Sequence, residues 1–107
     1  MKDYFTSVLL EARFGAEKPG KVDLCRGGQL FAGLNCFEPG QTQQVHTHAG
    51  ADKFYFLVTG KARMMVGSET REATAGDLIW APAGVPHGVV EALERTVMLV
   101  AIAPPPG

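Results

Sequence analysis

The histidines of this chain are the residues whose spacing points most directly to chemistry. His46 and His48 are separated by a single residue, and His87 is the third histidine. On a β-strand, residues i and i+2 point to the same face, about 6.6 Å apart along the chain. Two imidazoles so placed can both reach one metal ion at ~2.0–2.1 Å. The pattern therefore predicts a divalent metal on His46, His48 and His87; the alternative is that they are ordinary polar side chains of solvated strands.

Short strands between tight turns must position these histidines. The chain holds 13 Gly and 7 Pro, and the runs between them are rich in Val, Phe, Leu, Tyr and Thr, as is typical of many short strands. We expect a helical turn or two near 6–13 and strands at 21–25, 30–37, 42–48, 53–58, 61–66, 70–74, 78–81, 87–91 and 96–103. Because no crossover helices separate these strands, they predict an antiparallel all-β sandwich or small barrel.

Length and composition predict one ordinary globular domain. The chain has 107 residues, 46% hydrophobic and 20% charged, with a net charge of -1. We expect a single domain over 1–107, with a core at about 20–103 and a flexible tail at 104–107. Charges of one sign never form a long block, which argues against nucleic acid or a membrane surface as a partner.

The cysteines and the N-terminus predict a cytoplasmic protein. Cys25 and Cys36 are too few for a disulfide framework, and we expect both to be small buried side chains with reduced thiols. The first residues contain only the short apolar run 8–10, which is not the pattern of a signal peptide. No window approaches the ~20 apolar residues of a membrane span.

Two spaced motifs carry a family resemblance. The first has the pattern G-x5-H-x-H from Gly40 to His48, followed by Gly60. The second has the pattern G-x5-P-x-G-x2-H from Gly76 to His87. They resemble the two cupin motifs, G-x5-H-x-H-x3,4-E-x6-G and G-x5-P-x-G-x2-H-x3-N, and together they cover about half of the chain, 40–91. The resemblance implies a jelly-roll β-barrel with its site inside the mouth.

The chain departs from the cupin pattern at two positions. Counting back seven residues from Gly60 places Lys53 where the family has its metal-binding Glu, with Asp52 beside it. Adjacent strand residues face opposite ways, so only one of the two can face the pocket unless a bulge intervenes. Glu91 replaces the usual Asn, and we expect it to share a face with His87 but to lie too far away to bind the same metal.

Lys53 leaves three interpretations open. A Lys⁺ repels a metal dication, and burial disfavours its charge, so we favour Lys53 turning to solvent and leaving a three-histidine site with open positions. A neutral Lys53 could instead donate a hydrogen bond to a substrate or act as a base. In the third interpretation the metal is absent and the pocket binds an anion.

Strand alternation predicts which other side chains face the pocket. The inward set is Gln44 with the paired histidines, Tyr55 and Leu57 with Lys53, and Trp80 with Met64 or Met65. The outward set is Phe54, Phe56 and Val58, and we expect the two phenylalanines to be covered in a homodimer. Tyr55 is the aromatic residue best suited to chemistry, because its hydroxyl could meet a substrate oxygen.

Three functions fit these residues. The first is a metal-dependent dioxygenase or related oxidoreductase on a small polar organic molecule, with Fe, Mn, Ni or Zn as the ion. The resemblance extends to three-histidine cupins such as thiol and diketone-cleaving dioxygenases, so the missing carboxylate does not exclude iron chemistry. The second is a non-catalytic pocket for a small ligand or metal. The third is an isomerase or lyase that uses Lys53 or Tyr55 for proton transfer.

Overall fold

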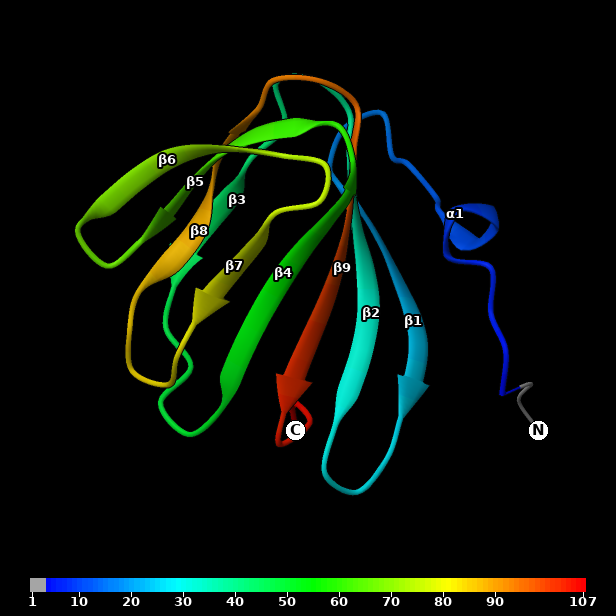
Figure 1. The fold of residues 1–107 in the computed structure, drawn as a ribbon, viewed down its shortest axis with the longest axis vertical. Coiled ribbons are helices and arrows are strands. Elements are labelled where there is room, and N and C mark those ends of the chain that lie inside the picture. Colours follow the sequence, from blue (N-terminus) through cyan, green and yellow to red (C-terminus); the bar gives the residue numbers. More distant parts are fainter. Residues whose placement is uncertain (1–3) are drawn as a thin grey trace.

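The chain folds into two antiparallel sheets that face each other (Figure 1). The computed structural model describes residues 4–107; Met1–Asp3, the start of the segment read above for a signal peptide, lie outside the described residues. The strands are β1 (Gly20–Arg26), β2 (Phe31–Phe37), β3 (Gln43–His46), β4 (Asp52–Thr59), β5 (Lys61–Val66), β6 (Glu69–Thr74), β7 (Leu78–Ala81), β8 (His87–Ala92) and β9 (Thr96–Ala103). One sheet has the order β1-β2-β9-β4-β7 and the other β3-β8-β5-β6, so the predicted all-β jelly-roll architecture is confirmed.

Side chains pack on both faces of the larger sheet. The space between the sheets holds a buried cluster that includes Phe37, Tyr55, Leu57 and Met98. On the other face, a second cluster of Leu34, Cys36 and Val97 is covered by the N-terminal segment and its helix α1 (Val8–Glu11), which lies beside β1 in Figure 1. Packing therefore extends N-terminal to the predicted core, which began near residue 20.

Two of the turns need backbone conformations that glycine allows. Gly60, between β4 and β5, has a φ of 91°, and Gly84, in the turn before β8, has a φ of 83°. Side chains other than glycine rarely adopt such positive φ angles. A Cβ at Gly60 would also collide with the backbone of Arg95 and the hydroxyl of Thr96. Gly60 therefore lets the β4–β5 hairpin pack against the start of β9. This agrees with the glycine that the first motif has at this turn.

The alternation of β4 follows the prediction. Lys53, Tyr55 and Leu57 are buried, whereas Phe54 and Phe56 are partly exposed on the opposite face. Trp80 is paired directly with Phe54 across β4 and β7, so it shares the outer face and is 52% exposed. The expectation that Trp80 lines the cavity is therefore wrong. Met64 is buried in the core between the sheets, and Met65 is only partly buried.

Two irregularities in strand pairing change which residues face inward. Gln43 pairs with Val89 and His46 with His87, so β3 carries one extra residue between these pairs. An extra residue reverses the alternation, which places Gln43 on the face of His46 and leaves Gln44 exposed. The prediction that Gln44 shares the face of His46 and His48 is therefore wrong.

A second irregularity lies in β8. Arg63 of β5 pairs with Glu91, but the next residue, Met64, pairs with Val89, so β8 has one extra residue between them. Val89 is buried and Glu91 is exposed, with a carboxylate oxygen 3.9 Å from the Arg63 guanidinium. Glu91 therefore does not share the face of His87, and that expectation is corrected.

The cysteines and the C-terminal tail differ in part from expectation. Cys36 is buried as predicted, whereas Cys25, near the end of the edge strand β1, is exposed. Residues 104–107 form no strand, and the Pro106 carbonyl accepts a hydrogen bond from Arg26. Within residues 4–107, no helix is long and apolar enough to cross a membrane.

Candidate metal centre

The three histidines converge at one end of the space between the sheets. His46 ends β3 and His87 begins β8, and these two residues are direct partners across the strand pair. His48 lies two residues past His46, so all three rings meet, with centroids 4.4 Å apart for His46 and His87 and 5.3 Å apart for His48 and His87. One ring nitrogen from each histidine lies within 4.8 Å of the others. This cluster could hold a metal ion.

Backbone carbonyls fix the orientation of two rings. His46 Nδ1 lies 2.9 Å from the Gln44 carbonyl oxygen, and His87 Nδ1 lies 2.9 Å from the Val85 carbonyl oxygen. A carbonyl can only accept, so each Nδ1 carries the hydrogen and donates it, which leaves the Nε2 lone pair free. This is the arrangement that orients metal-binding histidines in proteins.

The buried ring nitrogens show that the cluster fits a metal. Among the described residues, Nε2 of His48 and Nε2 of His87 are the buried side-chain atoms without a hydrogen-bond partner. Leaving a buried polar group unpaired costs about 1–3 kcal/mol. A metal ion bound to both nitrogens would remove this cost. Burial is the main cause that lowers the pKa of His48 and of His87, and the charge of Lys53 lowers both further, while the hydrogen bond to the Val85 carbonyl offsets part of the shift of His87. Both rings are therefore neutral at pH 7, the form that binds a metal.

Lys53 faces the site rather than solvent. Its side chain is only 4% exposed, and its Nζ lies 4.4 Å from the centre of the Tyr55 ring. The favoured expectation that Lys53 turns to solvent is therefore wrong, because β4 keeps its alternation through this residue. Burial, followed by the charge of Lys21, lowers the pKa of Lys53 to about 8. Asp52 points outward instead, and its Oδ1 accepts a hydrogen bond from the Ala83 N–H at 2.9 Å.

Tyr55 forms a hydrogen bond with Gln43, a site residue that the sequence did not predict. Its hydroxyl donates a 2.6 Å hydrogen bond to Oε1 of Gln43, and burial raises the pKa of Tyr55. The bond leaves the amide N–H groups of Gln43 free toward the site. Gln43 could not be found by simple alternation, because the extra residue in β3 carries it inward.

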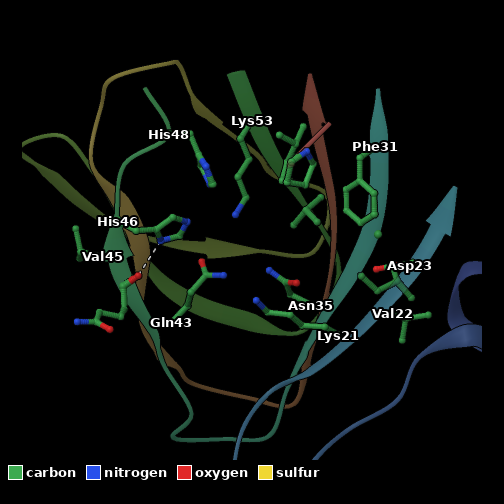
Figure 2. A pocket seen from close by; sticks show the side chains of 16 residues that line it. Lys21, Val22, Asp23, Phe31, Asn35, Gln43, Val45, His46, His48 and Lys53 are labelled. Carbon is green, nitrogen blue, oxygen red and sulfur yellow. Dashed lines mark hydrogen bonds between the residues drawn. The ribbon is translucent and has the colours of Figure 1, made fainter. Parts of the chain in front are cut away.

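A cleft of ≈ 590 Å³ opens beside the histidines (Figure 2). His46, His48 and Lys53 lie at one side, while Lys21 from β1 and Asn35 from β2 lie across from them. Apolar side chains, among them Phe31, Val100 and Ile102, complete the lining. Lys21 and Asn35 belong to no motif. The signal that could have found Lys21 is the polar–apolar alternation of β1, with Lys21 and Asp23 opposite Val22 and Leu24.

The fold and the histidine cluster are those of a cupin, and comparison with known proteins agrees. Residues 33–103 match the family model described as the cupin domain, and the chain belongs to this family. It is 33% identical over 96 residues to the uncharacterized protein SCO3923 of Streptomyces coelicolor, covering 90% of each chain.

Solved structures show the same fold along nearly the whole chain. The TT1209 protein from Thermus thermophilus is 35% identical, with a TM-score of 0.90 over 95% of this chain and 98% of that one. An RmlC-like cupin from Desulfovibrio desulfuricans is 26% identical, with a TM-score of 0.85 over 99% of each chain.

Proposed function

We propose that this protein is a metal-dependent enzyme, a dioxygenase or related oxidoreductase acting on a small polar organic substrate. His46, His48 and His87 would hold one divalent ion, of iron, manganese, nickel or zinc. The observation that carries the proposal is the pair of buried Nε2 atoms without a hydrogen-bond partner, on His48 and His87, in a cluster whose other side, at His46 and His48, lines an open cleft. When bound, the ion would polarise a substrate oxygen and, in the case of iron, supply the redox chemistry of a dioxygenase.

The residues around the histidines have separate tasks in this proposal. Lys53 and the amide of Gln43 donate hydrogen bonds to substrate oxygens and orient them toward the histidines. Tyr55 is a positioning residue, because its hydroxyl acts on the substrate through Gln43. Val100 and Ile102 line the cleft with apolar surface that keeps water from part of the substrate.

A second candidate function rests on Lys53 alone. A lysine with a pKa of about 8 exchanges its proton near neutral pH, which suits a general base or acid in an isomerase or lyase. Tyr55 is the other residue predicted for proton transfer, and its raised pKa and its bond to Gln43 favour the positioning role. The remaining alternative is a protein that binds a small ligand or metal without catalysis, and the experiment below also tests it.

Oxygen uptake distinguishes these functions. We expect the Fe(II)-loaded protein to consume oxygen with at least one compound from a panel of diketones, thiols and catechols, and the Zn(II)-loaded protein to consume none, because zinc has no redox chemistry. An oxygen electrode run on both forms measures this. Silence of the Fe(II) form across the panel, with metal bound, would remove the dioxygenase and leave the proton-transfer and binding functions.

We further propose that the protein is a cytoplasmic homodimer. Phe54 and Phe56 share the outer face of β4 with Leu78 and Trp80 of β7, and the latter two are more than half exposed. Contiguous exposed apolar side chains of this kind mark protein interfaces. Light scattering at micromolar concentration should give twice the chain mass of 11.4 kDa, and a value near 11.4 kDa would exclude the dimer.

A further inference from the structure

We propose that the ligand of this site is a small carboxylate bearing a second oxygen on the neighbouring carbon, such as a 2-oxo acid. Its carboxylate would lie between Lys53 and Lys21, and its second oxygen would face His46, His48 and His87. This assignment rests on the proposed function, because it names the substrate class of the same site.

Lys53 is a buried cation that lacks an anionic partner. Lysine is rarely so buried unless it is paired, because the loss of hydration is costly. Within residues 4–107, the ion pairs are formed by Lys61, Arg63, Arg71 and Arg95, and no side-chain hydrogen bond engages Lys53. Figure 2 shows the Lys53 side chain extending into the cleft toward the histidine rings. A ligand anion would supply the missing partner.

Three further donors face the same space. Lys21 and Asn35 are direct partners across β1 and β2, and Figure 2 shows both side chains reaching into the cleft beside Gln43. Asn35 is only 6% exposed, and no side-chain hydrogen bond engages its amide within the described part of the chain. The Gln43 amide keeps its N–H groups free because Tyr55 occupies its oxygen. Two ammonium and two amide groups form a lining rich in donors, which suits carboxylate oxygens.

The rest of the cleft fits this charge and limits the size of the ligand. Among the described residues that line it, Asp23 is the one carboxylate; it is exposed on β1 and lies on the side away from His46 and His48 in Figure 2. Phe31 and Ile102 add apolar surface next to the donors. A volume of ≈ 590 Å³ with this lining admits a small organic anion.

Calorimetry with a matched pair of probes tests the assignment. Pyruvate and butane-2,3-dione have the same shape around their vicinal oxygens, and only pyruvate carries a carboxylate. We expect Ni(II)-loaded protein to bind pyruvate more tightly than the dione, and Lys53→Met to reduce that preference by about tenfold or more. The control Lys61→Met removes a lysine outside the cleft and should leave the preference unchanged. Lys21→Met should reduce it as well, and this residue serves as the test if Lys53→Met does not fold.

The outcomes separate this assignment from the proposed function. If nickel binds and the preference survives in Lys53→Met and Lys21→Met, or if pyruvate fails to bind wild type, the carboxylate assignment is overturned and the metal site stands. If no metal binds, the proposed function fails. In that case the metal-free protein is tested with pyruvate. Binding by wild type that is lost in Lys53→Met still supports the carboxylate site, whereas the absence of binding by wild type overturns it.

Discussion

Replacing His46 by alanine is expected to lower the affinity of the protein for divalent metal by at least about 100-fold, since one of three ligands is lost. His46 lies opposite His87 across β3 and β8, and its ring is oriented by the Gln44 carbonyl. Titration calorimetry with Ni(II) and Zn(II), together with metal analysis of the purified variant, measures the loss.

The matched control for His46→Ala is Thr47→Ala. Thr47 is the neighbouring residue and is exposed, so its removal changes the same segment without touching the histidine cluster. We expect Thr47→Ala to bind metal like wild type, and both variants to keep the β-sheet circular dichroism spectrum. Equal metal affinity in His46→Ala and Thr47→Ala would show that the cluster is not a metal site.

Lys53→Glu is expected to tighten metal binding by about tenfold or more. The Lys53 side chain is buried and points toward the histidines, so the exchange replaces a repelling positive charge by a carboxylate that can bind the ion. Position 53 is also where the cupin motif has its metal-binding Glu. The measurement is the dissociation constant for Ni(II) and Zn(II) in both proteins.

Lys53→Met separates the two parts of this effect. It removes the positive charge without adding a ligand, so its metal affinity should fall between those of wild type and Lys53→Glu. Binding by Lys53→Glu that is weaker than binding by Lys53→Met would mean that a carboxylate at this position cannot reach the ion.

Much of this fold could be predicted because its signals are local. Turn residues between short apolar runs predicted the strands, and the His46-Thr47-His48 spacing predicted that two imidazoles share a face. The alternation of β4 correctly predicted that Tyr55 lies on the side of Lys53. Each of these signals operates within one strand, so no knowledge of the pairing partner was needed.

The wrong predictions occur where the pairing between strands determines which face of the sheet a side chain points to. The extra residue in β3 exchanges Gln43 for Gln44, and the extra residue in β8 turns Glu91 outward. Trp80 faces outward because it is paired with Phe54 in β4, which the sequence of β7 alone cannot reveal. In each case the deciding information is the register between two strands.

The expectation that Lys53 turns to solvent was wrong for a different reason. The cost of burying a charge argued for a lysine in solvent, yet the uninterrupted alternation of β4 places it inside. That cost is expressed in the pKa of Lys53, which burial lowers to about 8, and the cleft beside the side chain can hold a hydrogen-bond partner for it. Lys21 and Asn35, which lie across the cleft, were missed because tertiary packing brings β1 and β2 to the site; the alternation of β1 indicates only which face Lys21 shares with Asp23.

The metal content of the wild-type protein tests the central claim most directly. The metal content of protein purified without added metal should be measured by inductively coupled plasma mass spectrometry. The protein should then be stripped with a chelator and titrated with Fe(II), Mn(II), Ni(II) and Zn(II). If His46, His48 and His87 form a metal site, about one equivalent of a divalent ion will be bound per chain, either as purified or after titration. A protein that holds no metal and binds none of the four ions would contradict the account.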